Sequence, residues 1–314
     1  MHYIPLVTSL MLPQHTADRR VMAFMAKQTR MREASLRNFK GAVLGRMTAH
    51  AKIKERYDPA EGDEQSRIWH VGRYKFAQAY ATGGTVLDIA CGNGYGTDLL
   101  REAGASHTVG VDISLESVRR ARHSSPSTAI SYLLMDGRSL GLENEVFDLV
   151  VSFETIEHIH EFDKFLFELH RVLRPAAKCI ISTPNKAYWQ DRTQKNPFHV
   201  VEFGERELRD ALAPYFDSVT LFGQALSSVG RDTMRSWKTN IRDAMNDQMW
   251  VVRTMMRVLY YPNRHFIPDI VKGFCVRRLL RVQTSKPDLS HLEISTESVG
   301  GSQVLIAVCE KGGR

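Results

Sequence analysis

Residues 86–96, with the sequence VLDIACGNGYG, constrain the fold more than any other part of the chain. An apolar strand runs directly into glycines at alternate positions, Gly92, Gly94 and Gly96. Glycine has no Cβ atom, so the backbone can turn sharply there and a ligand can touch the main chain. A strand followed by such a loop is typical of α/β folds that bind a nucleotide-like cofactor, although a glycine-spaced loop alone is a weak signal.

Acidic residues close three apolar strands at equal intervals. Asp88, Asp112 and Asp136 are separated by 24 positions each. A strand, a helix and two short loops need roughly that many residues, so the three side chains should lie at the carboxyl ends of adjacent parallel strands. Open α/β sheets bind ligands at that edge. A carboxylate after the second strand can accept hydrogen bonds from both hydroxyls of a ribose.

Five segments in order resemble the motif series of class I S-adenosylmethionine-dependent methyltransferases. They read VLDIACGNGYG, VGVDIS, MDG, FDLVVSFETIEH and RVLRPAAKCIISTPN. The resemblance implies an α/β fold, a Rossmann-like seven-stranded sheet with helices on both faces, and S-adenosylmethionine as the cofactor. A nicotinamide-dependent dehydrogenase is the alternative, but its loop usually reads Gly-x-Gly-x-x-Gly, and residue 97 here is threonine.

The chain is expected to divide into four segments. They are a basic helical N-terminal extension (1–54), the methyltransferase core (55–224), a basic helical insertion (225–302) and the last core strand with the tail (303–314). Hydrophobic patterning predicts core strands near 84–88, 107–112, 130–135, 146–152, 177–183, 218–222 and 304–308.

Charge is distributed unevenly along the chain. The formal net charge is +7, but residues 1–56 carry +8 and residues 225–290 carry +7, so the rest is acidic. These basic segments could attract a phospholipid surface, a diphosphate-linked lipid or nucleic acid, or they are ordinary solvated helix faces.

The four cysteines lack paired or metal-type spacing, which indicates reduced thiols. No segment is long enough to span a membrane, so we expect a cytoplasmic protein, with peripheral contact at the inner membrane face as a further expectation.

The resemblance also assigns cofactor contacts. Gly92 and Gly94 would contact the methionine portion, Asp112 the ribose, and Asp136 with Gly137 the adenine. The complete expected set is Arg73, Tyr74, Asp88, Gly92, Gly94, Asp112, Ile113, Asp136, Gly137 and Phe153.

The segment FETIEH, residues 153–158, holds the expected catalytic residues. If it opens a helix, Glu154, Glu157 and His158 share one face at positions i, i+3 and i+4. Methyl transfer from a sulfonium is an in-line displacement, and an alcohol acceptor must also lose a proton. Histidine is the natural base near neutral pH. Alternatively, the glutamates complement the positive end of a helix and His158 is a packing residue.

The same residues also suggest a metal site. Glu154, Glu157 and His158, with the later His199, resemble the arrangement in small-RNA terminal ribose methyltransferases and ubiquinone-pathway O-methyltransferases. There a divalent ion organises the acceptor hydroxyls. Two carboxylates and two imidazoles would suit Mg, Mn or Zn.

Residues 182–185 and 196–203 follow the fifth strand at the ligand edge. With residues 73–74 and 223–224 they resemble a bacterial group associated with surface-polysaccharide and glycosyltransferase systems. The resemblance implies that Asn185, His199 and Glu202 border the acceptor pocket, and that the acceptor is a sugar hydroxyl on a glycan or glycolipid precursor. Three alternatives stay open: an RNA ribose 2'-O-methyltransferase, a small-molecule O-methyltransferase and a non-catalytic cofactor-binding scaffold.

Overall fold

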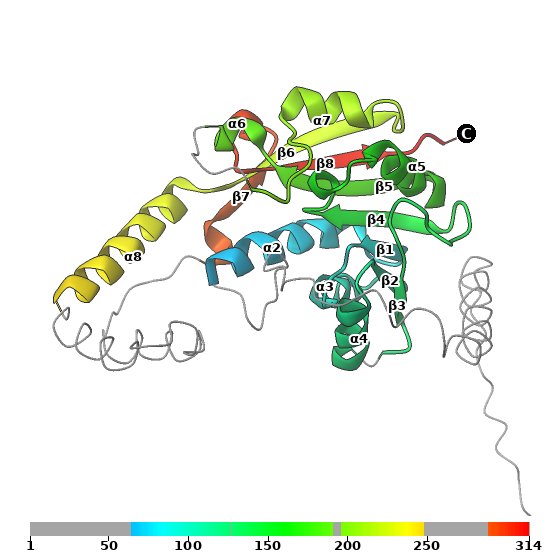
Figure 1. Cartoon of the computed structure of the whole chain (residues 1–314), viewed down its shortest axis with the longest axis horizontal. Helices are drawn as coiled ribbons and strands as arrows, with labels where there is room; N and C mark the ends of the chain where they lie inside the picture. Colours follow the sequence, from blue (N-terminus) through cyan, green and yellow to red (C-terminus); the bar gives the residue numbers. More distant parts are fainter. Residues whose placement is uncertain (1–63, 126, 191–195, 248–287, 314) are drawn as a thin grey trace, which may run out of the picture.

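The computed structural model describes residues 64–125, 127–190, 196–247 and 288–313. The predicted N-terminal extension and most of the predicted insertion lie outside these residues. The described part forms one eight-stranded sheet flanked by helices (Figure 1), with strand order β3-β2-β1-β4-β5-β8-β6-β7. Strands β1 to β5 run parallel, and β8 is antiparallel to both β5 and β6.

The strand bounds follow the predicted ones closely for the core. The strands are β1 (Thr85–Ile89), β2 (His107–Asp112), β3 (Ile130–Leu134), β4 (Phe147–Phe153), β5 (Leu173–Pro184), β6 (Ser218–Leu226), β7 (Leu292–Ser295) and β8 (Val304–Glu310). All seven predicted strands are present, and the Rossmann-like α/β fold is confirmed.

The eighth strand, β7, was not predicted. It lies in the region expected to be helical and pairs antiparallel with the outer edge of β6, with Leu226 opposite Leu292 and Gly223 opposite Ser295. Residues 292–295 alternate between apolar and polar over only four positions, which is too short a run to predict a strand. The strand forms because Leu292 and Ile294 are half-buried and β6 offers it an unpaired edge.

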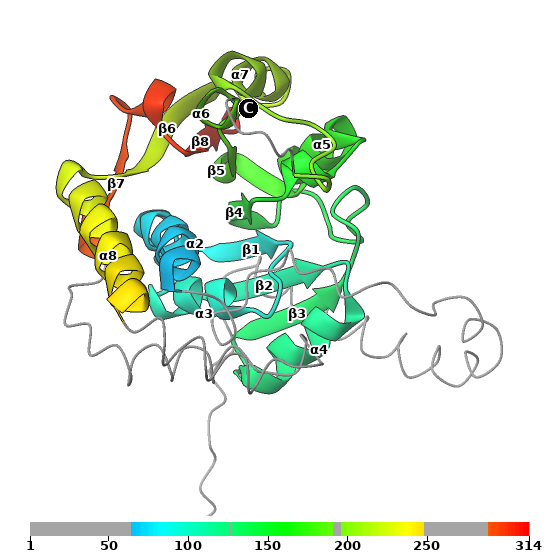
Figure 2. The same cartoon turned by 60° about the vertical axis from the view of Figure 1, so that its left-hand side comes forward.

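Helices pack against both faces of the sheet (Figure 2). They are α2 (Glu64–Ala77), α3 (Tyr95–Glu102), α4 (Leu115–Ser124), α5 (Phe162–Val172), α6 (Lys186–Trp189), α7 (Glu205–Leu212) and α8 (Ser228–Asp247), with 3-10 turns η1 (Gln78–Tyr80), η2 (Ile156–His158), η3 (Leu289–His291) and η4 (Val299–Gly301).

Alternate side chains of the central strands pack into two different apolar cores, one on each face of the sheet. Leu87 of β1 packs in one apolar cluster with α5 and α7, whereas its neighbour Val86 packs in another with α2 and α3. This is the period-2 alternation of a sheet that is buried on both faces. The apolar stripe of α5, including Phe165 and Leu169, is fully buried. No helix of the described residues is both long and apolar enough to cross a bilayer.

Candidate active site

The carboxyl ends of the parallel strands border a cavity of about 1120 Å³. Ligand pockets usually measure roughly 300–1,000 Å³, so this cavity has room for a cofactor and an acceptor together. Most of the residues predicted for the site line it: Tyr74, Gly92, Asp112, Ile113, Asp136, Gly137, Phe153, Glu154, Glu157, His158, His199 and Glu202.

The glycine loop has the backbone that its sequence predicts. Gly92 and Gly94 have φ angles of 56° and 85°, in the left-handed region that favours glycine. A Cβ atom on Gly92 would meet none of the described residues within 4 Å, and this glycine lines the cavity. A Cβ on Gly94 would lie 2.5 Å from the Tyr132 hydroxyl oxygen. On Gly96 it would lie 1.9 Å from the Tyr74 ring, so close packing explains that glycine.

Asp88 supports the loop from beneath. Its carboxylate is buried and accepts hydrogen bonds from the Thr97 hydroxyl at 2.7 Å and the Tyr74 hydroxyl at 3.2 Å. Burial raises the pKa of Asp88 to about 7, and the two hydrogen bonds oppose that rise. Asp88 therefore joins α2, β1 and α3 behind the cavity wall.

Asp112 lies at the end of β2, as predicted for a ribose ligand. Its carboxylate oxygens accept from the Gly92 amide at 3.0 Å and the Ser114 amide at 2.7 Å. These bonds fix the carboxylate beside the glycine loop. Each carboxylate oxygen can accept more than one hydrogen bond, so capacity remains for ribose hydroxyls.

Asp136, after β3, is paired with a residue that the sequence analysis did not identify. Arg138 donates to Asp136 Oδ2 from Nη2 at 2.6 Å and to Glu161 Oε2 from Nη1 at 2.9 Å. The hydrogen bond from Arg138 lowers the pKa of Asp136. The predicted adenine end therefore carries a fixed arginine–carboxylate pair.

The segment after β4 does not form the predicted α-helical face. It forms a single 3-10 turn, η2, preceded by Glu154 at φ 49°. The Glu154 carboxylate accepts from the Ser182 hydroxyl at 2.8 Å and lies 3.8 Å from the Arg73 guanidinium. The left-handed backbone at Glu154 prevents an α-helix from starting there. The Glu154 side chain points to Ser182 of β5, whereas Glu157 and His158 lie on the 3-10 turn.

Glu157, His158 and His199 come together across 42 positions of sequence. One ligand atom from each lies within 4.8 Å of the others. The Glu157 carbonyl accepts from the Val200 and Val201 amides at 2.9 and 3.2 Å, which holds the later segment against η2. The two imidazole rings consequently meet edge to face, with centroids 5.1 Å apart.

Hydrogen bonds assign the tautomers of both rings. His158 Nδ1 lies 3.0 Å from the Phe198 carbonyl, which can only accept, so Nδ1 donates and Nε2 carries the lone pair. Asn196 Oδ1 accepts from the Phe198 amide at 3.0 Å, which leaves the Asn196 amide nitrogen to donate to His199 Nε2 at 3.0 Å. His158 Nε2 is therefore the basic nitrogen of the cluster, 3.9 Å from Glu157 Oε1.

The Glu157 carboxyl is unusually placed for an acidic group. It is 1% exposed, and its Oε2 atom has no hydrogen-bond partner within the described residues. Burial, reinforced by the charge of Glu154, raises the pKa of Glu157 well above its ordinary value. A buried carboxyl without a full set of partners is costly, which is typical of a functional site.

Asn185 corrects one prediction. Its side chain is buried, donates to the carbonyls of Val299 and Ser302 at 3.2 and 2.9 Å, and caps α6 by accepting from the Ala187 amide. The side chain therefore ties β5 to η4 instead of bordering the acceptor pocket. The resemblance to the bacterial group implied a pocket role, but the partners of Asn185 in a distant loop could not be read from the sequence.

Two other predicted residues lie behind the cavity wall, and several residues that were not predicted line it. Arg73 is fully buried beside the cavity, and Gly94 is buried against Tyr132. The lining residues that sequence reasoning missed include His70, Lys186 and Trp189. Of these three, only His70 had a signal in the sequence. It lies one helical turn before Tyr74, so both side chains were expected on the same face of the helix.

Comparison with known proteins agrees with this geometry. Residues 87–181 match the family model described as "Methyltransferase domain". A protein of Mycolicibacterium smegmatis named "Probable S-adenosylmethionine-dependent methyltransferase" is 35% identical over 132 residues, covering 41% of this chain and 50% of that protein. The mitochondrial ubiquinone biosynthesis O-methyltransferase of Rattus norvegicus is 32% identical over 111 residues, covering 33% of this chain and 32% of that protein.

Solved structures also resemble the chain. A SAM-dependent methyltransferase from Thermotoga maritima has 13% identity and a TM-score of 0.49, covering 78% of this chain and 90% of that one. The chain spans half or less of the length of these curated relatives. The matched residues 87–181 hold the glycine loop and the strand-end acids, and they resemble the methyltransferase domain of S-adenosylmethionine-dependent relatives.

Proposed function

We propose that this protein transfers the methyl group of S-adenosylmethionine to a hydroxyl oxygen. The observation that carries the proposal is the His158 imidazole, which lines the cavity and whose Nδ1 lies 3.0 Å from the Phe198 carbonyl, so that Nε2 is the nitrogen left to act as a base. An acceptor hydroxyl would donate its hydrogen bond to Nε2. The oxygen attacks the methyl carbon, the carbon–sulfur bond breaks with its electron pair left on sulfur, and the proton passes to His158. The products are a methyl ether and S-adenosylhomocysteine.

The cofactor would lie across the ends of β1, β2 and β3. Asp112 would accept from the ribose hydroxyls, and the open face of Gly92 would let the ligand touch the main chain. Holding donor and acceptor in line is the larger part of this catalysis, because the reaction needs little covalent help from the protein.

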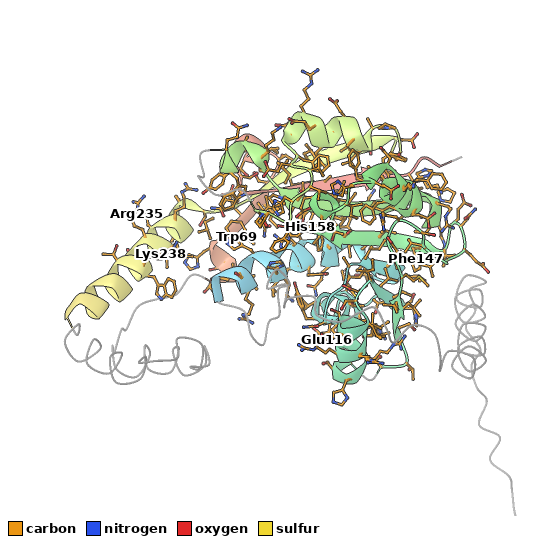
Figure 3. The ribbon with its side chains drawn as sticks, in the orientation of Figure 1. Trp69, Glu116, Phe147, His158, Arg235 and Lys238 are labelled. Carbon is orange, nitrogen blue, oxygen red and sulfur yellow. The ribbon has the colours of Figure 1, made fainter. Side chains whose placement is uncertain are left out.

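A sugar hydroxyl on a glycan or glycolipid precursor is the proposed acceptor. Polar side chains of the acceptor half, including His199 and Glu202, can hydrogen-bond a polyol. Arg235 and Lys238 are exposed on α8 (Figure 3), which supports an anionic acceptor such as a diphosphate-linked precursor. The rat relative, named as an O-methyltransferase, supports oxygen as the methylated atom.

A divalent ion in the same cluster is a second candidate. Glu157, His158 and His199 offer a carboxylate and two imidazoles within 4.8 Å of one another, and Glu157 Oε2, which lacks a hydrogen-bond partner among the described residues, fits a cation. A bound ion would supply positive charge that favours the alkoxide form of the acceptor. Glu154, held by Ser182, is not part of the cluster.

Two measurements test the proposal. Calorimetric titration with S-adenosylhomocysteine, with and without chelator, tests cofactor binding. Transfer of labelled methyl groups to nucleotide sugars, lipid-linked glycans, catechols and RNA then tests the acceptor. His158→Ala should keep the affinity for S-adenosylhomocysteine and lose turnover by about 100-fold or more, while His123→Ala, at an exposed position of α4, should leave both unchanged.

Each alternative has its own outcome. Near-normal turnover by His158→Ala would move the base elsewhere. Turnover abolished by chelator and restored by Mg²⁺ or Mn²⁺ would establish the metal site. Acceptor binding that weakens steeply with salt, with methylation of RNA only, would replace the sugar with nucleic acid. Cofactor binding without methylation of any acceptor class would favour the scaffold.

A further inference from the structure

Helix α2 brings three polar side chains to one corner of the cavity. His70, Arg73 and Tyr74 lie at positions i, i+3 and i+4 and so share one face of the helix. His70 and Tyr74 line the cavity, whereas Arg73 is buried behind them. The group that α2 presents to a ligand beside Tyr74 is therefore the His70 imidazole, not the arginine.

Arg73 is held from several elements at once. Its Nη1 donates to Gln224 Oε1 of β6 at 3.1 Å and lies 3.8 Å from Glu154 Oε1 after β4. Gln224 is fully buried and its amide nitrogen donates to the Trp69 carbonyl at 2.9 Å, which fixes its orientation. Arg73 Nη2 lies 3.0 Å from His70 Nδ1. The guanidinium is thus a rigid positive group directly behind His70.

This contact assigns the proton of His70. A guanidinium can only donate, so His70 Nδ1 must accept, and the proton of the neutral ring sits on Nε2. Burial, with the charge of Arg73, lowers the pKa of His70 to about 2. His70 is consequently a neutral ring with a permanent Nε2–H donor, polarised by the charge behind it.

The position of His70 indicates which part of a cofactor it would meet. Asp112 and Asp136 follow β2 and β3, so the ribose and adenine lie on that side of the glycine loop. The amino-acid portion must extend the other way, across β1 towards β4. His70 lies at that end, because its partner Arg73 contacts Glu154 at the end of β4.

We infer that His70 binds the carboxylate of the cofactor's methionine portion through its Nε2–H, with Arg73 positioning and polarising the ring. The inference rests on the proposed use of S-adenosylmethionine. It also accounts for the Arg73 Nε atom, which is buried and has no hydrogen-bond partner within the described residues. A nearby ligand carboxylate would help to balance that buried charge.

The test compares two ligands that differ only at this end. S-adenosylhomocysteine carries the amino-acid group, and 5'-deoxy-5'-methylthioadenosine has the same adenosine and thioether without it. His70→Asn keeps an acceptor for Arg73 near the position of Nδ1 but has no atom at the position of Nε2. We expect His70→Asn to weaken S-adenosylhomocysteine binding about 10- to 100-fold and to leave methylthioadenosine binding unchanged. His70→Gln, whose amide reaches farther, should recover part of the loss.

The other outcomes separate this inference from the proposed function. Unchanged binding of S-adenosylhomocysteine by His70→Asn, or a higher acceptor KM with unchanged cofactor affinity, would overturn the role of His70 while leaving the methyltransferase proposal intact. An equal loss for both ligands would also overturn it, because the change would then act through the fold. If wild-type protein with an intact thermal transition bound neither ligand, both proposals would fall.

Discussion

Three glycines with left-handed backbones allow strain, packing and ligand contact to be separated. Gly83, Gly92 and Gly94 have φ angles of 74°, 56° and 85°. An added Cβ would meet nothing within 4 Å at Gly83 or Gly92, but at Gly94 it would meet the Tyr132 ring and hydroxyl at 2.5–2.8 Å. Gly83 lies before β1 and does not line the cavity, whereas Gly92 does. The same chemical change therefore has three different consequences.

Alanine at each glycine should cost stability by an amount set by its surroundings. The left-handed conformation costs about 1–2 kcal/mol for a residue with a Cβ, so Gly83→Ala and Gly92→Ala should lose that much free energy of unfolding. Gly94→Ala adds overpacking against Tyr132, for a total of about 2–5 kcal/mol. Urea titration followed by circular dichroism measures all three values.

Cofactor affinity should follow a different order from stability. Gly83→Ala should bind S-adenosylhomocysteine like wild type. Gly92→Ala places a methyl group where the ligand is expected to touch the main chain, and a steric cost of about 1–3 kcal/mol weakens binding about 5- to 150-fold. Isothermal titration calorimetry gives both constants. Wild-type affinity in a folded Gly92→Ala variant would refute the reasoning, since the ligand could not then approach this face of the loop.

Further predictions concern the carboxylates and the amide around the cavity. Asp112→Asn should weaken S-adenosylhomocysteine binding about 10- to 100-fold with a folded core, and unchanged affinity would remove Asp112 from the ribose site. Because the pKa of Asp88 is raised from 3.8 to about 7, the folded protein holds a proton there that the unfolded chain releases, and this residue's contribution to stability falls as pH rises through that window. Asp88→Asn should remove this fall in urea titrations, and parallel pH curves for both proteins would contradict it. Asn185→Ala should lower the free energy of unfolding by about 1–3 kcal/mol while acceptor KM stays constant; the opposite pattern would restore Asn185 to the acceptor pocket.

The sequence predicted the fold and the position of the glycine loop at the cavity because the signals there are local. The glycine loop follows its strand directly, and Asp112 and Asp136 lie at the edge of the parallel sheet that borders the cavity, whereas Asp88 lies inside β1 behind the cavity wall. The loop and the strand ends are determined by the backbone geometry and length of short continuous segments, so they can be predicted from the local sequence. Strand β7 was not predicted because four residues are too few to show the alternation of apolar and polar residues that is typical of a strand.

The acceptor half could be predicted only in part because it is assembled by long-range contacts. Glu157 and His158 meet His199 through main-chain bonds to Val200 and Val201, and the predicted α-helix is replaced by a 3-10 turn. Arg73 meets Gln224 across 151 positions. The residue types of Glu157, His158 and His199 suggested a catalytic or metal-binding role. The residues that orient these side chains lie on other elements, so the sequence did not show their geometry.

Those orienting partners give the two ends of the cavity opposite hydrogen-bonding character. His158 is held by a carbonyl, which can only accept, so its cavity nitrogen carries a lone pair. His70 is held by a guanidinium, which can only donate, so its other nitrogen carries a proton. Each assignment applies to the neutral ring and follows from a partner that has one fixed hydrogen-bonding role. A proton acceptor therefore lies where the proposed function needs a base for the acceptor hydroxyl, and a donor lies where the proposed cofactor's carboxylate is expected.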